Sequence, residues 1–396
     1  MKFSSRVAGI SASATLAVME QAQRLRRQGI DVIDLGPGEP DFATPQAIKE
    51  AGIEAIDRDF TKYTAATGIL ELREAVAERY NRRWGTDFSA ANVAITCGAK
   101  HAIFEVCMAL FEGGDEVLIP SPYWVTFPEI VKMADASPRI VVTGQENGFL
   151  LDPVGVDSRL TSSTRGLLIN TPNNPTGAVL PQVTLNQIVE LSRRQGLFLL
   201  CDETYEFFVY EDSSPASLAA SVRADDDFFA IVGSVSKTYA MTGWRIGYCV
   251  GHRRLIDRLR AFQSHQTGNP TSISQKAALA ALRGEPAEIE TMRREYQKRR
   301  ELVVALLAKI PGFECVPPKG AFYAFPNVSR ALRATGMSNS EEFSRFLIEE
   351  ARVATVPGVA FGAEGYIRIS YATSFQNLQE GLSRIRAVVE RAMAKP

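Results

Sequence analysis

Seven short apolar runs, separated by helical patterns, constrain the fold of this 396-residue chain more than any other feature. Each run has the length of one buried strand. Apolar strands that alternate with helices over short connections predict a largely parallel sheet with helices on both faces. We therefore expect an α/β fold with a mostly parallel seven-stranded sheet, whose strands lie at residues 93–96, 116–119, 139–142, 166–170, 197–201, 228–233 and 245–250.

The chain on either side of these runs predicts a second, smaller domain. Helical patterns at 13–28, 45–57 and 70–84 precede the sheet, and a short strand is expected at 31–35. After residue 251 the chain is mostly helical, and its last part mixes short strands with helices: strands are expected at 322–325, 353–356 and 366–370, and helices at 340–351 and 374–393. We expect residues 1–45 to join a small α+β domain at 286–396, with residues 46–285 forming the large domain.

Composition excludes several classes of protein. The net charge is −1 with no long block of one sign, which argues against nucleic acid or an anionic membrane as a partner. Five scattered cysteines and three distant histidines fit neither a disulfide frame nor a metal site. No apolar run reaches the roughly 18 residues of a membrane span, and no signal-like core follows Met1. We expect a cytoplasmic protein with reduced thiols.

A lysine flanked by two serines follows one of the predicted strands. The segment holds Ser234, Ser236 and Lys237, and Arg245 lies eight positions after the lysine. A lysine can form an imine with a carbonyl when burial or a neighbouring cation lowers its pKa. The serines and Arg245 could then hold a phosphate. By itself the pattern is equally that of a solvated loop lysine.

Three further segments place polar groups where a ligand of a parallel sheet would bind. Around Ala99 and Lys100 a strand gives way to a helix, whose free amides could bind a phosphate, although a plain tight turn has the same sequence. Asp202 ends a buried strand and needs a partner there, or caps a helix. Arg368 lies in an alternating strand and could grip a carboxylate through its fork, or form a surface ion pair.

Taken in chain order, the motifs resemble class I (fold type I) aminotransferases, which use pyridoxal 5′-phosphate (PLP). The most specific are N-x-P-N-N-P-T-G at 170–177 and S-x-S-K-x-x-x-M-T-G-W-R-x-G at 234–247. G-E-P-D-F at 38–42 and P-x-P-Y-W at 120–124 add to them. The resemblance covers most of the chain, and no position that the family requires is missing.

The resemblance implies a role for each motif residue at the cofactor. Lys237 would hold PLP as a Schiff base and then act as the general base, while Asp202 keeps the pyridine nitrogen protonated. Asn174 and Tyr205 would bind the ring hydroxyl oxygen, and Trp124 would stack on the ring. The phosphate would be bound by the amides of Ala99 and Lys100, by Ser234, Ser236 and Arg245, and by Tyr63 of the partner subunit, which implies a homodimer.

On the substrate side, the resemblance implies that Arg368 binds the α-carboxylate and that Gly38, Trp124 and Asn174 line the site. The implied reaction moves an amino group between an L-amino acid and a 2-oxo acid by ping-pong chemistry. The N-terminal run resembles the bacterial aspartate aminotransferase branch, where Lys100, with Ser13 and Thr15, would bind a distal carboxylate. Aspartate and 2-oxoglutarate are therefore expected as substrates.

Other functions stay open at this stage. If Lys100 is a surface helix lysine, aromatic amino acids, alanine or prephenate become candidate substrates. A PLP-dependent lyase or decarboxylase would keep Lys237, Asp202 and Arg368 but release a different product. A non-catalytic regulator on this fold would carry a DNA-binding segment, and only about thirty residues precede Asp31.

Overall fold

The computed structural model describes residues 1–210, 213–284 and 287–394. Its central strands are β2 (Val93–Thr96), β3 (Glu116–Ser121), β4 (Ser137–Val142), β5 (Thr164–Asn170), β6 (Phe198–Asp202), β7 (Phe229–Ser234) and β8 (Gly247–Gly251). They form one sheet in the order β2-β8-β7-β6-β5-β3-β4. The strands from β7 to β4 are parallel, whereas β8 is antiparallel to both β7 and β2. The predicted α/β fold with a mostly parallel seven-stranded sheet is confirmed.

The burial of each strand explains why its sequence is apolar throughout or alternates. Strand β7, in the interior of the sheet, is buried at every residue, because helices cover both of its faces. Edge strand β4 exposes Ser137, Arg139 and Val142 and buries only Val141. Within β5, Leu167 and Ile169 join the core on one face while Leu168 joins the core on the other, as the two-residue period of a strand requires.

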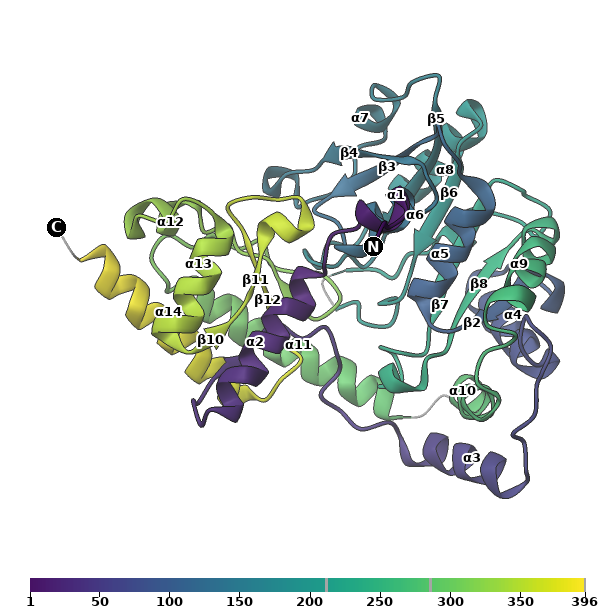
Figure 1. The fold of residues 1–396 in the computed structure, drawn as a ribbon, viewed down its shortest axis with the longest axis horizontal. Coiled ribbons are helices and arrows are strands. Elements are labelled where there is room, and N and C mark those ends of the chain that lie inside the picture. The colour runs from purple at the N-terminus through teal and green to yellow at the C-terminus, as the bar shows by residue number, and fades with distance from the viewer. Residues whose placement is uncertain (211–212, 285–286, 395–396) are drawn as a thin grey trace.

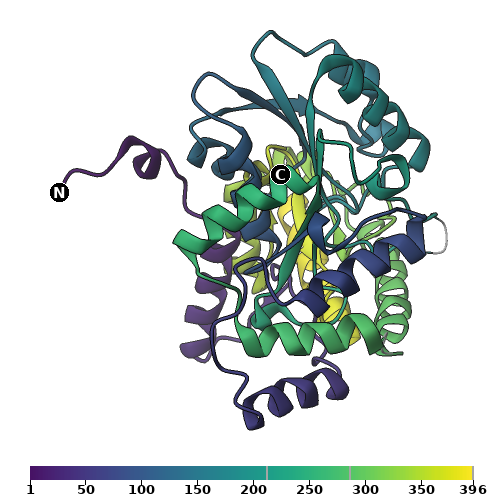
Figure 2. The ribbon, with the colours of Figure 1, turned by 90° about the vertical axis from the view of Figure 1, so that its right-hand side faces the viewer.

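Helices lie on both faces of this sheet (Figures 1 and 2). One face is covered by α4 (Leu70–Trp84), α8 (Gln182–Gln195) and α10 (Ser272–Gly284), and the other by α5 (Ala99–Leu110), α6 (Thr126–Met133) and α9 (Arg253–Gln266). Helix α3 (Gln46–Asp57) packs on α10, and α7 (Pro153–Asp157) packs on α8. Short 3₁₀ turns are η1 (Ala90–Asn92), η2 (Gln145–Asn147), η3 (Leu218–Ser221) and η4 (Thr242–Trp244).

The C-terminal part of the chain packs beside the sheet, to the left in Figure 1. It contains α11 (Glu288–Leu307), β9 (Tyr323–Ala324), α12 (Ser329–Thr335), α13 (Ser340–Phe346), the π-helical turn η5 (Leu347–Ala351), β10 (Val353–Ala354), β11 (Val356–Pro357), η6 (Gly358–Phe361), β12 (Ile367–Ser370) and α14 (Phe375–Met393). Strands β11, β12 and β9 form an antiparallel sheet. An aromatic-rich core lies among these elements.

The N-terminal segment comprises α1 (Ser5–Ala8), α2 (Ala14–Arg27) and β1 (Ile33–Asp34). Helix α1 contacts α6, whereas α2 and β1 pack against the C-terminal part. Strand β1 pairs in parallel with β10, and Ala22 and Val32 share a small core with Ile348 and Ala354. The predicted domain boundary at residues 285 and 286 lies outside the described residues, so it stays a prediction.

Three predicted element boundaries were wrong. The strand expected from residue 245 begins at Gly247, because Arg245 adopts a left-handed conformation (φ 56°) after the η4 turn and the ladder with β7 starts only at Gly247. The strand expected at 353–356 is two strands, because the chain leaves β1 after Ala354 and pairs with β12 from Val356. The helix expected at 340–351 changes to a π-helical turn at Leu347.

The structure also describes the cysteines and the apolar character of the helices. All five cysteines lie in the described part of the chain and are free thiols. Among the helices of residues 1–210, 213–284 and 287–394, none combines the length and the apolar character that crossing a bilayer requires.

Candidate active site

A cavity of about 320 Å³ lies where strands β5, β6 and β7 end. These neighbouring strands are parallel, so their carboxyl ends meet at one edge of the sheet and carry Asn170, Asp202 and Ser234 to the same place. The lining of the cavity includes Gly38, Ala99, Lys100, Trp124, Asn174, Asp202, Tyr205, Ser234, Ser236, Lys237, Arg245 and Arg368. The fold therefore gathers residues that are far apart in the sequence, such as Gly38 and Arg368, which are 330 positions apart.

Lys237 enters the cavity from the loop that follows β7. Its Nζ donates a hydrogen bond of 2.5 Å to the carbonyl oxygen of Gly38. Burial lowers the pKa of Lys237 to about 8; the carboxylate of Glu39 opposes this shift, and the cation of Arg245 adds to it. A lysine with this pKa is partly uncharged near neutral pH, which is the state that a nucleophile or a general base needs.

The N-terminus of α5 and the side chain of Arg245 lie together at one end of the cavity. Gly98 precedes the helix with φ 93°, and a Cβ atom there would come within 2.3 Å of Nη2 of Arg245. A Cβ atom on Gly247 would lie 2.4 Å from the backbone nitrogen of Ala99. Arg245 is held by bonds of 2.8 Å to the oxygen of Thr242 and 3.2 Å to that of Cys97.

This end of the cavity fits a phosphate group. The two glycines allow Arg245 and the first turn of α5 to approach closely, because a side chain at either position would clash with them. The first amides of a helix have no intrahelical partner and can bind an anion. The arginine supplies a fixed positive charge, and Ser234 and Ser236 line the same wall. Ser234 also orients the loop, because its Oγ accepts a hydrogen bond of 2.8 Å from the backbone nitrogen of Ser236.

Asp202 presents a buried carboxylate to the cavity. Only 5% of the residue is exposed, and Oδ1 accepts a hydrogen bond of 3.0 Å from the backbone nitrogen of Thr204. Burial raises the pKa of Asp202, while the bonds from Thr204 and the charge of Lys237 act in the opposite direction. Among the described residues no side-chain cation forms an ion pair with Asp202, and a buried carboxylate without one is costly, so this wall fits a ligand that brings a positive charge.

Arg368 is 1% exposed and lies across the cavity from α5. It donates hydrogen bonds of 2.6 Å to the oxygen of Gly36 and 2.9 Å to Oδ1 of Asn174. Its Nε has no partner among the described residues. Because the amide oxygen of Asn174 is occupied by the guanidinium, the NH₂ group of Asn174 is left to donate to a ligand.

The structure adds a site residue that the sequence did not reveal. Tyr323, on β9, lines the cavity, and its hydroxyl oxygen lies 2.7 Å from that of Tyr205. Its ring centroid lies 4.5 Å from the guanidinium carbon of Arg368. In the sequence Tyr323 belongs to a run of apolar and aromatic residues that reads as core, and no local signal separates it from Phe322.

Lys100 lines the cavity together with residues from the N-terminal segment. Its Nζ lies 5.0 Å from the ring centroid of Trp124, and both residues line the cavity together with Ser13 and Thr15. Burial lowers the pKa of Lys100, and the charge of Arg245 lowers it further. Lys100 is therefore a cation that lines the cavity and is still exposed to solvent, so the structure does not distinguish a substrate-binding role from the surface helix lysine considered as the alternative.

Tyr63 is the one predicted site residue that this chain does not bring to the cavity. Its side chain is 93% exposed and is absent from the cavity wall. A tyrosine that projects so fully into solvent makes no contact that would explain its position within a single chain.

Comparison with known proteins gives consistent results along the chain. The family described as aminotransferase class I and II matches residues 30–385. An aspartate aminotransferase from Geobacillus stearothermophilus is 41% identical over 98% of this chain and 99% of its own. A protein from Aquifex aeolicus named "Probable aspartate/prephenate aminotransferase" is also 41% identical, over 98% of each chain. The structure of an aspartate aminotransferase from Thermus thermophilus with maleate has a TM-score of 0.93 at 39% identity and covers 98% of this chain and 100% of that one.

Proposed function

The chain belongs to the class I and II aminotransferases, which depend on PLP, and from this we propose that it exchanges an amino group between L-aspartate and 2-oxoglutarate. One observation carries the proposal: Lys237, Asp202, the phosphate-sized end of the cavity and two separate cations, Arg368 and Lys100, line a single cavity. Two cations that line one cavity suit a substrate with two carboxylates.

The residues present fit PLP. Ser234, Ser236, Arg245 and the amides of Ala99 and Lys100 would hold its phosphate, and Asp202 would face its ring nitrogen. Asn174 and Tyr205 would bind its ring hydroxyl oxygen, and Trp124 would cover its ring. When bound, PLP supplies an electron sink for the charge that develops on the α-carbon of the substrate.

Lys237 provides the proton transfer in this proposal. Because burial brings its pKa to about 8, roughly a quarter of the side chains are neutral at pH 7.5. A neutral amine can take the proton from the α-carbon, and the resulting ammonium can return it. The carbonyl of Gly38, 2.5 Å from Nζ, holds the amine in place while the site is open to substrate.

Asp202 and Arg368 supply fixed charges of opposite sign. The Asp202 carboxylate stabilises a positive charge on a bound ring, since burial strengthens the interaction between them. Arg368 offers its Nε and a rigid fork to the α-carboxylate, and its contacts with Gly36 and Asn174 fix the orientation of that fork.

Lys100, with Ser13 and Thr15, would bind the distal carboxylate of aspartate. The cation is already partly desolvated beside Trp124, so pairing with a carboxylate restores the interactions that burial removed. Names of the relatives support this choice, and the solved relative from Thermus thermophilus contains maleate, which is a dicarboxylate.

The assembly and location of the enzyme are also part of the proposal. We propose a cytoplasmic homodimer in which Tyr63 of the partner subunit completes the phosphate site, since Tyr63 is 93% exposed in the single chain. We also propose that residues 46–285 form the large domain and that residues 1–45 join the small domain at 286–396. The pairing of β1 with β10 supports the second assignment.

An amino-transfer assay with purified protein and PLP tests the proposed activity. L-aspartate and 2-oxoglutarate should give oxaloacetate and glutamate in equal amounts. Lys237→Ala should lower kcat by more than about 10³-fold, whereas Lys298→Ala, which changes an exposed lysine on α11, should leave it unchanged. Release of ammonia or carbon dioxide from aspartate would instead indicate a lyase or a decarboxylase, and no turnover would reject the proposal.

The role of Lys100 is tested by substrate selectivity. Lys100→Ala should lower kcat/KM for aspartate by about 10- to 100-fold, the usual loss for a charged hydrogen bond, and should change kcat/KM for alanine or phenylalanine much less. Lys132→Ala is the matched control, because Lys132 forms a surface pair with Glu129 (2.9 Å) outside this cavity. An equal loss for all substrates would show that Lys100 does not recognise the distal carboxylate.

A further inference from the structure

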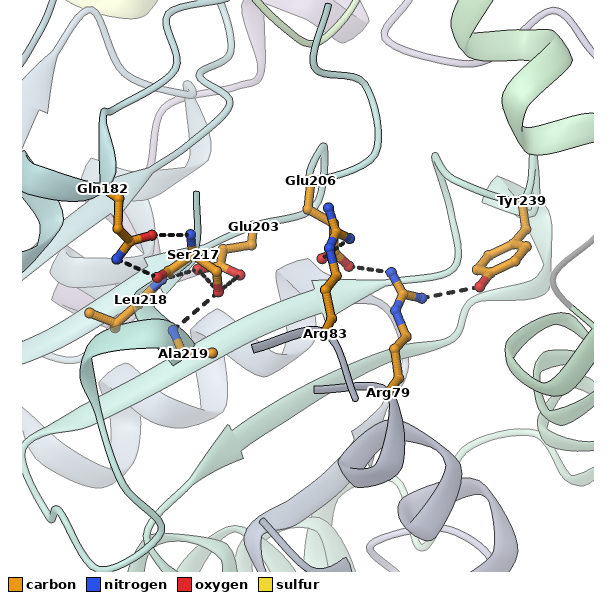
Figure 3. Close-up of polar contacts among 9 residues, drawn as sticks. All are labelled: Arg79, Arg83, Gln182, Glu203, Glu206, Ser217, Leu218, Ala219 and Tyr239. Atoms are coloured by element: carbon orange, nitrogen blue, oxygen red, sulfur yellow. Dashed lines mark hydrogen bonds and ion pairs between the residues drawn. The ribbon is translucent and has the colours of Figure 1, made fainter. Parts of the chain in front are cut away.

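A buried polar network lies behind the active-site cavity, on the segment that follows β6 (Figure 3). Asp202 and Tyr205 line the cavity, whereas their neighbours Glu203 and Glu206 do not. These two glutamates are nevertheless 1% and 7% exposed, so their carboxylates are satisfied inside the protein. The proposed function assigns them no role.

Glu206 forms the first arm of the network with two arginines of α4. Its Oε1 lies 2.5 Å from Nη2 of Arg79, and its Oε2 lies 3.1 Å from Nη1 of Arg83. Nη1 of Arg79 donates a second hydrogen bond, of 3.1 Å, to the hydroxyl of Tyr239. Figure 3 shows Arg79 between Glu206 and Tyr239. The Arg79 and Glu206 side chains are 8% and 7% exposed, so solvent screens this contact little.

Arg79 thereby joins two loops that the sheet itself leaves separate. Strands β6 and β7 pair up to Asp202 and Val232, and the nitrogen of Glu203 still bonds to the oxygen of Val232 at 2.9 Å. Beyond this point the described structure has no backbone hydrogen bond between residues 204–210 and residues 235–241. The first loop carries Tyr205 and the second carries Lys237, two residues before Tyr239.

We propose that Arg79 is a positioning residue for amino transfer: by binding Glu206 and Tyr239 together, its guanidinium holds the Lys237 loop in register with the Asp202–Tyr205 segment. The inference rests on the proposed function, since that function assigns proton transfer to Lys237. Only an arginine suits this role, because its two terminal nitrogens reach two partners at a fixed angle, whereas a lysine ammonium on a flexible stem does not.

The second arm of the network provides an internal comparison. The carboxylate of Glu203 accepts hydrogen bonds of 3.0 and 2.8 Å from Oγ of Ser217 and 2.8 Å from the nitrogen of Leu218. Gln182 on α8 binds Ser217 in turn. This arm ties the same segment to η3 and α8, and within the described part of the chain none of its hydrogen bonds reaches the Lys237 loop. Its loss should therefore cost stability without moving Lys237.

The test compares three variants of the full-length enzyme with bound PLP. Tyr239→Phe removes the hydroxyl that Arg79 binds and keeps the ring, and Arg79→Lys keeps the charge beside Glu206 but not the fork. Ser217→Ala removes a bond of similar kind from the second arm. For each variant we would measure the melting temperature, the dissociation constant for PLP, the pH midpoint of the absorption spectrum of the bound cofactor, and kcat and KM for aspartate.

A positioning role predicts a change in the cofactor readouts. Tyr239→Phe and Arg79→Lys should raise the dissociation constant for PLP by about 3- to 10-fold. They should also shift the spectral midpoint by about half a pH unit, because a displaced loop changes the distances between the cofactor-bound nitrogen of Lys237 and the charged groups around it. The kcat should fall more than the KM rises. Ser217→Ala should lower the melting temperature alone.

The opposite pattern overturns the inference. If both Tyr239→Phe and Arg79→Lys lower the melting temperature while the dissociation constant and the spectral midpoint stay at the wild-type values, the network is only structural. If Arg79→Lys fails to fold, Tyr239→Phe decides the question alone, since it removes a single oxygen. A wild-type enzyme that binds PLP but transfers no amino group would instead reject the proposed function. The activity of the wild-type enzyme is therefore measured first, before the variants are compared.

Discussion

At the scale of single residues, burial changes the chemistry of several groups. Lys237 and Asp202 carry shifted pKa values because the fold removes water from them. Glu105 on α5 shows the same effect away from the cavity: it is fully buried, and neither carboxylate oxygen has a hydrogen bond within the described residues. Its Oε1 lies 3.3 Å from Nε2 of His101.

The burial of Glu105 predicts a pH dependence of stability. Burial raises its pKa from 4.5 to about 8, so the folded state keeps a proton that the unfolded state loses above pH 4.5. The stabilisation is therefore complete below pH 4.5 and is lost as the pH rises toward 8, by about 1.4 kcal/mol per pH unit. The Glu105→Gln substitution removes the titrating carboxyl group, so the unfolding free energy should lose this part of its dependence on pH.

Urea unfolding of wild type and Glu105→Gln at two pH values checks this prediction. The difference in unfolding free energy between them should change by about 2 kcal/mol between pH 5.5 and 7.5. The same comparison with Glu78→Gln, an exposed position, should show no such change. Parallel pH profiles for wild type and Glu105→Gln would contradict the raised pKa.

At the scale of elements, the site depends on how strands end and helices begin. The turn from β2 into α5 is shaped by Gly98, whose φ of 93° few other residues adopt and whose missing side chain makes room for Arg245. The helix can therefore present its first amides beside a guanidinium. The phosphate end of the cavity therefore depends on the contact between the start of α5 and the side chain of Arg245, and neither forms it alone.

Gly98→Ala should weaken cofactor binding more than it weakens the fold. The new Cβ would meet Nη2 of Arg245 at 2.3 Å, so the guanidinium must move out of the cavity wall. We expect the dissociation constant for PLP to rise by about 10-fold or more, the loss of roughly one charged hydrogen bond. Equilibrium titration of the apoenzyme, followed by fluorescence, measures it.

Gly196→Ala is the matched control for this change. Gly196 also has a positive φ, of 65°, but a Cβ atom there would meet nothing within 4 Å. The Gly196→Ala substitution should lower the free energy of unfolding by about 1 kcal/mol and leave the affinity for PLP unchanged. Equal affinities for wild type and Gly98→Ala would show that Arg245 does not need its observed position.

At the scale of the whole molecule, the site lies between the seven-stranded sheet and the C-terminal part. Arg368 comes from β12, and Gly38 comes from the loop after β1. That loop is tied to α11, because Nη1 of Arg299 lies 2.8 Å from both carboxylate oxygens of Asp41. The Arg299 side chain is 7% exposed and that of Asp41 is 29% exposed.

Asp41→Asn should loosen the Gly38 loop and reduce activity. The change removes the negative charge that pairs with a buried guanidinium, and we expect a loss of about 1–3 kcal/mol of stability, reduced from the fully buried case because Asp41 is partly exposed. The kcat/KM for aspartate should fall by about 10-fold, because the carbonyl of Gly38 that binds Lys237 moves with the loop. Denaturant unfolding and steady-state kinetics measure the two effects.

Asp31→Asn provides the comparison for that variant. Asp31 pairs with Arg384 at 2.6 Å, but its side chain is 79% exposed. This change should alter stability by less than about 0.5 kcal/mol and leave kcat/KM unchanged. Similar effects of the two substitutions would show that the Asp41 pair has no special role in holding the loop.

The sequence by itself determined the class of the fold and most of the cavity wall. The seven apolar runs predicted the sheet, and motifs after two of them pointed to Lys237 and Asp202, while an alternating strand in the C-terminal part pointed to Arg368. Local patterns could do this because strand periodicity and strand-end chemistry are local properties.

Only the tertiary structure decided which distant groups share the site and the buried network. Tyr323 reads as core in the sequence, and only the tertiary structure, in which β9 pairs with β12, brings its hydroxyl to that of Tyr205 after β6. Arg79 lies in an ordinary helical pattern, and only the fold places it between Glu206 and Tyr239, which are 127 and 160 positions away. Burial and long-range contacts set these positions and the pKa of Lys237, and neither has a local signature in the sequence.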